Sequence, residues 1–461
     1  MTILVSNTIR ITEPTQEVVK WCDKNLVLSN PEYIKKQRMG FWVGNTPKKL
    51  YLYEKDGNDL ILPFGILKSL PNFFFHNAEV IPLFHDSTYV YYGDPVPLYD
   101  YQKEAVEYMY YENYGILQSP AGSGKTQMGI ALIKKFGRKA LWLTHTADLL
   151  NQSKQRAEMY MDKSLIGTIT EGKIDIGLGV TFATVQTMAN LDLPSLRNTW
   201  DVIIVDECHR VCGTPTAMGQ FYKVLNNLSA RHKIGLSATV HRSDGLIEAT
   251  YAILGRVEYV VPTAAVASTV MPVKIHPVST ETELSYECLN TDGTICYTSL
   301  ISYLTKNENR NKVIVDTLVK DKGMSSLILS DRLEHLKTLI SMLPEDMQKD
   351  AVMVDGKMTS KKGKAEREQA IEDMKSGRKK YLFASYRLAK EGLDIPCLER
   401  LHMATPQKDY AVVTQSVGRI ARVFEGKADP ICYDYVDDIP MLIKSYKARC
   451  RIYRKGGYEI L

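Results

Sequence analysis

Residues that suit phosphate binding stand together at Ser119-Pro-Ala-Gly-Ser-Gly-Lys-Thr126, between a short apolar run and a helical pattern. Gly122 and Gly124 would let the backbone curl so that its N–H groups converge on phosphate oxygens, and the following helix would add its dipole. Lys125 would reach the β and γ phosphates of a nucleoside triphosphate, and the Thr126 hydroxyl would bind Mg²⁺. Because Ser119 stands where the strict pattern has glycine, the alternative is a glycine-rich turn without a ligand.

An acidic pair that could complete such a site follows the apolar run 202–205. A run of this kind predicts a strand buried on both faces, which would place Asp206 and Glu207 at the carboxyl edge of a sheet, beside the phosphate loop. Asp206 would hold Mg²⁺, usually through water, and Glu207 would orient and deprotonate an attacking water molecule. Taken alone, the pair fits a surface acidic pair after a core strand equally well.

The elements that must position these residues form two α/β stretches, 96–268 and 269–461. In each, apolar runs of strand length alternate with helical patterns, which predicts parallel sheets covered by helices. The predicted strands are 115–118, 140–143, 180–183, 202–205 and 233–236 in the first stretch, and 326–329, 351–354, 381–384, 400–403 and 431–434 in the second. Residues 270–305 are weakly patterned, so we expect a connector there.

Residues 1–95 are rich in aromatic residues and proline and carry no nucleotide motif. The runs 49–54 and 59–62 around Asp56-Gly57 predict a β-hairpin. We expect a small α+β accessory domain, with DNA binding as one option, since Ile34-Lys-Lys-Gln-Arg38 adds local positive charge.

Composition narrows the class of protein. The chain has 461 residues, a formal net charge of +5, 44% apolar and 24% charged residues, the balance of an ordinary soluble protein. No apolar run approaches the ~20 residues of a membrane span, and the N-terminus lacks the pattern of a secretory signal. The eight cysteines are scattered without a CxxC pair, so reduced thiols in the cytoplasm are expected. Cys208, His209 and Cys212 lie close together but make a weak metal signal.

Two basic stretches could contact nucleic acid. Six Lys and Arg residues between 444 and 456, interleaved with Tyr446 and Tyr453 and without an acidic residue, suit phosphate contacts with some stacking. The alternative is a solvated helix. Residues 357–380 are also basic, but glutamates and an aspartate are interspersed there, so a solvated face is an equal interpretation.

Across residues 98–436, the chain resembles superfamily 2 helicases and translocases. Asp206-Glu-Cys-His209 is similar to a DExH motif II. The other matching segments follow in family order: Tyr101-Gln102, the phosphate loop, 144–152, 184–187, Ser237-Ala-Thr239, 391–394 and Gln415-Ser-Val-Gly-Arg-Ile-Ala-Arg422. The segment 236–245 further resembles the XPB-like and phage UvsW-like branches, and the DEAD-box branch fits less well.

The resemblance implies two tandem RecA-like domains that hydrolyse ATP with Mg²⁺, and it assigns roles to residues of this chain. Catalytic residues would be Lys125, Asp206, Glu207, Gln415, Arg419 and Arg422. ATP would be bound by Tyr101, Gln102, Ala121, Gly122, Ser123, Gly124, Lys125, Thr126, Gly392 and Asp394. Nucleic acid would be contacted by Thr144, Thr146, Thr184, Gln186, Ser330, Ser385, Arg387 and Lys390, for which helix caps and strand ends are the alternative. Ser237, Ala238 and Thr239 would couple ATP to strand movement.

Arginines of the second domain would complete the ATP site. Arg422 is the leading candidate for an arginine finger, a device worth ~10³–10⁵ in rate, and Arg419 would lie on the same helix face. Domain closure with ATP and opening after hydrolysis would then produce stepping along a strand.

Four functions remain open at this point: a DNA helicase that remodels forks and Holliday junctions, a duplex translocase without strand separation, an RNA helicase, and a nucleotide-gated binding protein that does not use ATP. We expect a monomer whose partners are branched or duplex DNA and, as an option, a single-strand-binding or recombination protein. A membrane partner is not expected. The compartment would be the cytoplasm, that of the host if the chain is phage-encoded.

Overall fold

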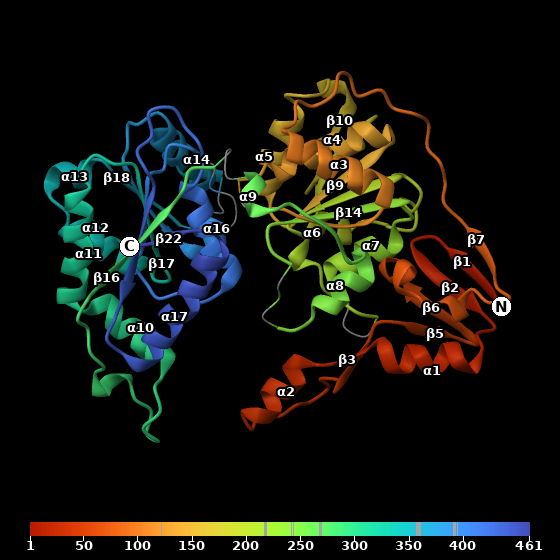
Figure 1. The fold of residues 1–461 in the computed structure, drawn as a ribbon, viewed down its shortest axis with the longest axis horizontal. Coiled ribbons are helices and arrows are strands. Elements are labelled where there is room, and N and C mark those ends of the chain that lie inside the picture. The colour runs from red at the N-terminus through yellow and green to blue at the C-terminus, as the bar shows by residue number, and fades with distance from the viewer. Residues whose placement is uncertain are drawn as a thin grey trace. The chain divides into compact units, whose positions relative to one another are not determined.

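The computed structural model describes residues 1–120, 122–215, 219–240, 242, 244–266, 270–355, 361–390, 393 and 395–461, except for the side chains of 361, 364 and 390 (Figure 1). The chain divides into two compact units. The first unit comprises Met1–Pro120 with Gly124–Pro262, and the second comprises Ala121–Ser123 with Thr263–Leu461. In the described part of the chain, no helix has the length and apolarity to cross a membrane.

The main sheet of the first unit, which we call the first lobe with its helices, has the strand order β11-β10-β12-β9-β13-β14-β8-β15. Neighbouring strands pair in parallel except β10 and β11. The bounds are β8 (Gly115–Gln118), β9 (Ala140–Thr144), β10 (Ile166–Thr170), β11 (Lys173–Asp175), β12 (Val180–Thr184), β13 (Val202–Asp206), β14 (His232–Ser237) and β15 (Val257–Val260). All five predicted strands are confirmed to within one residue at each end, and the parallel α/β plan with them.

Helices cover this sheet because their apolar residues recur at helical spacing. The bounds are α3 (Asp100–Glu112), α4 (Lys125–Phe136), α5 (Ala147–Ala157), η3 (Lys163–Leu165), α6 (Val185–Ala189), η4 (Cys208–Arg210), α7 (Gln220–Asn227) and α8 (Ile247–Leu254). Helix α4 lies close to the sheet because Gly129 has no side chain: a Cβ there would come within 2.8 Å of Trp142 and Leu236. The helix that begins at Lys125 is therefore held firmly against strands β9 and β14.

Residues 1–95 form a second, mixed sheet in the same unit, with the order β5-β6-β2-β1-β7. Its elements are β1 (Thr2–Val5), β2 (Thr8–Thr12), α1 (Gln16–Asn25), β5 (Glu54–Asp56), β6 (Asp59–Pro63), η1 (Phe64–Ser69), η2 (Asn72–Phe74) and β7 (Glu79–Pro82). The predicted hairpin turns at Gly57, where φ is 60°, and joins β5 to β6. Residues 49–51, expected in that hairpin, instead form β4 (Lys49–Tyr51), which pairs with β3 (Val27–Ser29) around α2 (Pro31–Arg38).

The N-terminal sheet shares its core with the first lobe, because its apolar cluster includes Tyr114, Ala249 and Ala252. A Cβ on Gly65 would lie within 3 Å of backbone atoms of α8 and Gly255, so η1 and α8 touch through their backbones. Arg197 donates to the side chains of Ser6 and Asn7 at 3.3 and 2.7 Å. The accessory domain is thus docked on the first lobe, and the boundary at residue 95 stays a prediction.

Lys233 lies buried in this contact, with 1% of its surface exposed. Its ammonium donates to the carbonyl of Leu225 at 3.0 Å and to that of Asn7 at 3.5 Å, and it lies 5.1 Å from the centre of the Phe64 ring. Burial lowers the pKa of Lys233 to about 7, because the charged form loses its hydration. In the unfolded chain the amine keeps a pKa near 10.5.

We expect Lys233 to make the first unit more stable as the pH rises from 7.5 to 9.5. In this range the unfolded chain binds a proton that the folded chain does not, so the free energy of unfolding gains about 1.4 kcal/mol per pH unit. Lys233→Met removes this contribution. The measurement is urea unfolding followed by tryptophan fluorescence, since all four tryptophans, at positions 21, 42, 142 and 200, lie in the first unit. The exposed Lys173→Met is the control, and equal slopes for wild type and Lys233→Met would refute the expectation.

The second unit, or second lobe, contains one parallel sheet with the order β18-β19-β17-β20-β21-β16-β22. Its strands are β16 (Lys274–Ser279), β17 (Ser326–Ser330), β18 (Ala351–Val354), β19 (Tyr381–Ser385), β20 (Arg400–Met403), β21 (Ile431–Val436) and β22 (Glu459–Ile460). Its helices are α9 (Thr263–Val266), η5 (Tyr286–Cys288), α10 (Tyr297–Lys306), α11 (Glu308–Lys320), α12 (Leu333–Met342), α13 (Glu345–Lys349), α14 (Lys361–Lys375), α15 (Tyr386–Lys390), α16 (Tyr410–Ile420) and α17 (Pro440–Lys455). The five strands predicted for this lobe are confirmed.

The expected connector at 270–305 is wrong in part, because β16 joins the sheet and α10 follows it. Pro277 in β16 weakens the strand pattern in the sequence, since proline cannot donate to a ladder. The position tolerates proline because β22 pairs only with Lys274 and Ile275, so it does not reach Pro277.

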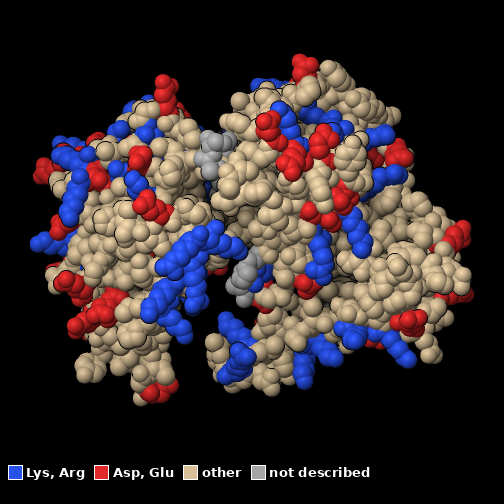
Figure 2. Space-filling model, viewed as in Figure 1, with Lys and Arg blue, Asp and Glu red and all other residues tan. Residues whose placement is uncertain are grey.

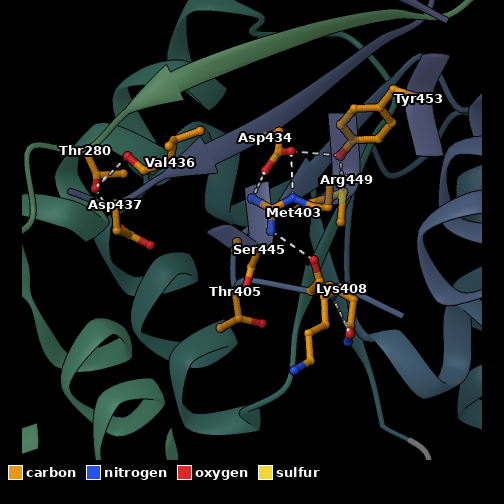
Figure 3. A network of polar contacts seen from close by, with 12 residues as sticks. Thr280, Met403, Thr405, Lys408, Asp434, Val436, Asp437, Ser445, Arg449 and Tyr453 are labelled. Carbon is orange, nitrogen blue, oxygen red and sulfur yellow. Dashed lines mark hydrogen bonds and ion pairs between the residues drawn. The ribbon is translucent and has the colours of Figure 1, made fainter. Parts of the chain in front are cut away.

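Two buried ion pairs hold the second lobe together. Arg449 donates to both carboxyl oxygens of Asp434 at 2.8 Å, and the Tyr453 hydroxyl donates to the same carboxylate (Figure 3). Asp437 accepts from Arg310 at 2.6 Å and from the Thr280 hydroxyl at 2.6 Å. Because every charge has a partner, these groups fix α17 and α11 against the sheet instead of leaving a buried charge uncompensated.

Candidate nucleotide site and nucleic-acid interface

The phosphate loop has the expected strand–loop–helix context, between β8 and α4. Gly122 and Gly124 have φ of 83° and 78°, left-handed values that glycine adopts without strain. The Ser119 N–H donates to the Ser237 carbonyl at 3.0 Å, so the start of the loop is tied to the end of β14. A Cβ on Gly124 would lie 2.5 Å from Nε2 of Gln102, which places the amide of the predicted adenine-binding glutamine beside the loop.

Gln102 itself is held by local contacts. Its Oε1 accepts from the Tyr99 N–H at 2.9 Å, and the side chain is buried. The rings of Tyr99 and Tyr101 stack with their centres 5.9 Å apart, and Tyr99 is 60% exposed. The two predicted adenine-binding residues are therefore together at the start of α3, and their role stays a prediction.

The acidic pair stands at the carboxyl end of β13, as predicted. Asp206 is buried, accepts from the Glu207 N–H at 2.9 Å and lies 3.5 Å from the Ser153 hydroxyl. Burial and the Glu207 carboxylate raise the pKa of Asp206 well above its usual range, and the positive charge of Lys125 opposes them. Glu207 has φ of 50°, a left-handed conformation that is costly for a residue with a side chain and that recurs at functional sites.

A path of polar contacts leads from this acidic pair to the predicted coupling residues. Nδ1 of His209 lies 3.2 Å from Oε2 of Glu207 and 3.0 Å from the Ser237 hydroxyl. That hydroxyl donates to the Thr239 carbonyl at 2.6 Å and accepts from the Thr239 N–H at 3.2 Å. Since the hydroxyl proton is used by Thr239, Nδ1 carries a proton and donates. Ala238, between the two, is buried.

Arg242 is a site residue to which the sequence interpretation gave no role. Its guanidinium donates to the carbonyl of His209 at 2.8 Å and forms an ion pair with Asp244. It therefore braces the turn that carries His209. The sequence offered one signal for this ion pair: Arg242 stands two positions before Asp244, just after Ser237-Ala-Thr239.

The four predicted nucleic-acid contacts of the first lobe lie together. Thr144 and Thr184 are paired across the carboxyl ends of β9 and β12. The hydroxyls of Thr146 and Thr184 accept from the N–H groups of Leu149 and Thr187, which makes both residues helix N-caps. Gln186 donates to the His145 carbonyl at 2.9 Å and so links the two loops. The capping role is thus observed, and contact with nucleic acid stays a prediction.

The second lobe repeats this arrangement. Ser330 and Ser385 are paired across the carboxyl ends of β17 and β19, and the Ser385 hydroxyl caps α15. Ser330 is fully buried, and its hydroxyl contacts Nδ1 of His335 and the Arg332 N–H, so it acts within the lobe. Arg387 is exposed on α15, whereas the side chain of Lys390 lies outside the described residues.

The arginines of the second lobe differ from the expected arrangement. Helix α16 ends at Ile420, so Arg422 is not on a helix face with Arg419; it forms an antiparallel bridge with Val270. Arg419 donates to the carbonyls of Ala389 and Leu393, each at 2.9 Å. Gln415 is buried in α16. Arg419 thus ties α16 to the segment after α15, where the predicted ATP contacts Gly392 and Asp394 lie outside the described residues, as does Ala121 of the phosphate loop.

The basic stretch near the C-terminus is divided between two faces of α17. Arg449 and Tyr453 point into the lobe and bind Asp434, so their expected exposure to nucleic acid is wrong (Figure 3). The exposed basic side chains, which we call the α17 stripe, lie on one helix face and form a continuous blue area in Figure 2; they are Lys444, Lys447, Arg451, Arg454 and Lys455.

The chemistry at the first lobe fits Mg²⁺ that is bound together with a triphosphate. Mg²⁺ usually takes one or two protein oxygens and completes its shell with water and phosphate. The Asp206 carboxylate and the Thr126 hydroxyl are oxygen ligands of this kind. Among the described residues, no group of three or more His, Cys, Asp or Glu side chains could hold a metal alone.

Two family models match the chain. The model described as "Type III restriction enzyme, res subunit" covers residues 95–242, and the "Helicase conserved C-terminal domain" covers residues 305–424. Together they span the phosphate loop, the acidic pair, the coupling residues and α16.

Curated proteins and solved structures add to this. The chain is 27% identical over 349 residues to "Probable helicase D10" of Escherichia phage T5, covering 75% of this chain and 73% of D10. It is 24% identical over 349 residues to "DNA 3'-5' helicase XPB" of Kineococcus radiotolerans, covering 71% of this chain but only 57% of XPB. Dbp5 of S. cerevisiae bound to RNA and ADP BeF3 has the same fold, with a TM-score of 0.54 and 16% identity. The alignment covers 79% of this chain and 94% of Dbp5.

T4 UvsW aligns over 100% of this chain and 99% of its own, with a TM-score of 0.41 and 19% identity. The two family models and the relatives D10 and XPB, together with two lobes that each contain a parallel sheet and carry the motifs in order, show that the chain belongs to superfamily 2 of the ATP-dependent helicases and translocases.

Proposed function

We propose that this protein is a DNA helicase that uses ATP and Mg²⁺ to move along DNA and to remodel branched DNA such as forks and Holliday junctions. The observation that carries the proposal is the path of polar contacts Glu207–His209–Ser237–Thr239, in which His209 lies 3.2 Å from the Glu207 carboxylate and hydrogen bonds join the other residues. It joins the predicted catalytic acid to the end of β14, which in turn binds the phosphate loop through Ser119. A change at the γ-phosphate can therefore be transmitted to Ser237 and Thr239 after β14.

The residues of the first lobe divide the chemistry among them. Lys125 neutralises charge on the β and γ phosphates, and the backbone N–H groups of the phosphate loop orient them. Mg²⁺, held by Asp206 and Thr126, would neutralise the charge that develops on the phosphate oxygens. Glu207 accepts the proton of the attacking water, and its fixed left-handed backbone aims the carboxylate. Arg419 and Arg422, with Gln415, are proposed to stabilise the transition state from the second lobe.

Both lobes carry groups of the kind that bind the phosphate backbone of DNA, which supports DNA binding. The capped helices after β9, β12 and β19 present N–H groups and hydroxyls of the kind that bind phosphates, and the α17 stripe adds five cations. Such contacts do not read sequence, so binding would be general and sensitive to salt. DNA is preferred over RNA because XPB is named a DNA helicase and the first family model is that of a restriction enzyme.

A duplex translocase without strand separation is the second candidate. It is favoured by the match of residues 95–242 to the res subunit of type III restriction enzymes. Displacement of a triplex strand without any unwinding would select it over the helicase.

We expect Lys125→Ala and Glu207→Gln to lower DNA-stimulated ATP hydrolysis by about 10²- to 10³-fold, because each removes a group that acts on the transition state. Glu207→Gln should keep its affinity for an ATP analogue, because the phosphate loop is intact.

ATPase assays with single-stranded, duplex, forked and four-way DNA and with RNA provide the measurement, with the exposed Glu171→Gln as control. Greatest stimulation by forked and four-way DNA and movement of a branch point are the expected results. Equal stimulation by RNA would favour an RNA helicase, and no stimulation would refute the motor.

The α17 stripe should contribute two phosphate contacts through Lys447 and Arg451. Replacing both by Gln should weaken DNA binding and lower the slope of log affinity against log salt by about 1.8, the value for two lost contacts with duplex DNA. Fluorescence anisotropy with a labelled duplex at several salt concentrations measures this. The control has the same change in charge: Lys322→Gln with Lys337→Gln, both 57% exposed and paired with acids. If the two double variants behave alike, the stripe acts only through net charge.

A further inference from the structure

Residues 27–51, which we call the arm, form a small structure of their own at the N-terminal sheet. Strands β3 and β4 pair at its base, and α2 and the loop after it extend away from α1 (Figure 1). No residue of α2 is buried. An eight-residue helix without a buried face gains little from packing, so the arm is not explained by a role in the core.

The arm exposes large apolar side chains in sequence. Met39, Phe41 and Trp42 are 55%, 63% and 87% exposed. Single exposed apolar residues are common, but a contiguous group marks an interaction surface. The other three tryptophans are not in this group: Trp142 and Trp200 are buried, and Trp21 is half-buried.

The exposed indole has a defined position. Gly44 has φ of 49°, and a Cβ there would lie 2.8 Å from the Trp42 ring, so one ring face rests against the glycine. The loop is tied back to its helix, because the Phe41 N–H donates to the Lys36 carbonyl at 2.9 Å and Lys36 donates to the Thr46 hydroxyl at 2.7 Å. Asn30 caps α2 and donates to the Pro47 carbonyl at 2.8 Å. The ring is therefore held for a contact on its open face.

Basic residues flank this ring in the sequence. The arm contains five basic residues, Lys35, Lys36, Arg38, Lys48 and Lys49, and one acidic residue, Glu32, which pairs with Lys36. Figure 2 shows blue side chains over the arm. Aromatic rings among cations suit unpaired nucleotides, whose bases stack while their phosphates are neutralised. Tyr286 in the second lobe is 91% exposed, but Glu281, Glu283 and Glu287 surround it in sequence, so exposure alone does not predict this partner.

The arm also faces Asp244 and Gly245, which follow the predicted coupling residues in the first lobe. A cavity of about 600 Å³ separates α2 from Asp244 and Gly245, with Ile34, Lys35, Arg38 and Met39 on the arm side. Asp244 pairs with Arg242, which binds the carbonyl of His209. Three contacts, Asp244–Arg242, Arg242–His209 and His209–Glu207, join this groove to the acidic pair.

We propose that the arm binds an unpaired nucleic-acid strand, with Trp42 and Phe41 stacking on bases and the lysines and Arg38 binding phosphates. The proposal rests on the proposed function, since it assumes a nucleic-acid substrate. It adds a binding element outside the helicase motifs, where bases and not only phosphates are contacted.

The test uses the full-length protein and a fluorescein-labelled oligothymidylate of 30 nucleotides. Trp42→Ala should weaken binding by about 5- to 100-fold, the range for loss of one stacked base, and Trp42→Phe should restore most of the affinity. Tyr286→Ala is the matched control and should bind as wild type. An abasic strand of equal length should bind wild type more weakly than oligothymidylate, and Trp42→Ala should lose this preference.

A second readout follows the indole itself. Oligothymidylate should quench the tryptophan fluorescence of wild type, and Trp42→Phe should abolish most of the quenching, because the other three tryptophans are buried or half-buried. Unchanged affinity in Trp42→Ala would overturn the proposal. If Trp42→Ala instead abolished self-association of wild type in sedimentation, the arm would be a protein interface and the proposal would also fall.

Failure of this proposal can be separated from failure of the proposed function. If forked DNA stimulates ATP hydrolysis by wild type while Trp42→Ala binds oligothymidylate as wild type does, only the proposal for the arm fails. If wild type shows no stimulation by any nucleic acid, the proposed function fails first.

Discussion

The shared carboxyl edge of the parallel sheet is the constraint on which the rest of the first lobe depends. Strands β8, β14 and β13 are neighbours that run in one direction, so the phosphate loop, Ser237–Thr239 and the acidic pair must emerge at the same edge. Consecutive residues of these strands are buried, so both faces of the sheet are covered and the three strands lie in the core. The polar residues follow directly after the apolar runs of these strands and are therefore placed by the core.

This placement has an electrostatic cost. Asp206 is buried beside a second carboxylate, and both effects disfavour its charged form. The positive charge of Lys125 offsets part of that cost, and a bound cation would offset more. A cation bound with a triphosphate would therefore stabilise this edge and would influence the loops that share it.

Docking of the N-terminal sheet extends the same rigid unit. Backbone contact between η1 and α8, the shared apolar cluster and buried Lys233 leave little freedom between residues 1–95 and the first lobe. The arm is consequently carried by the lobe that contains the phosphate loop. A strand held by Trp42 would move with that lobe, whereas a strand held by α17 would move with the other.

The sequence predicted the central strands well because apolar runs of four or five residues have few other uses in a soluble protein. It failed where tertiary contacts decide. The strand β16 was not predicted because Pro277 interrupts its pattern in the sequence. Strand β4 pairs with β3 and not with β6, since α2 connects β3 to β4. Arg449 and Tyr453 read as part of a basic surface, yet the partner that draws them inward, Asp434, is fifteen residues earlier than Arg449 in β21. The acidic pair could be predicted from the sequence. The contact of Arg242 with the His209 carbonyl could not, because it depends on the turn that carries His209.

Equivalent positions in the two lobes suggest why this family uses a repeated plan. Thr144 with Thr184, and Ser330 with Ser385, are paired across adjacent parallel strands at the same edge of each sheet. A motor that passes a strand from one grip to another needs two grips of similar strength, since a much tighter one would never release. The deeper member of each pair, Thr144 or Ser330, is fully buried, so a strand could reach only the half-buried members, Thr184 and Ser385. The exposed cations of α17 would add phosphate contacts in the second lobe, as the arm would in the first.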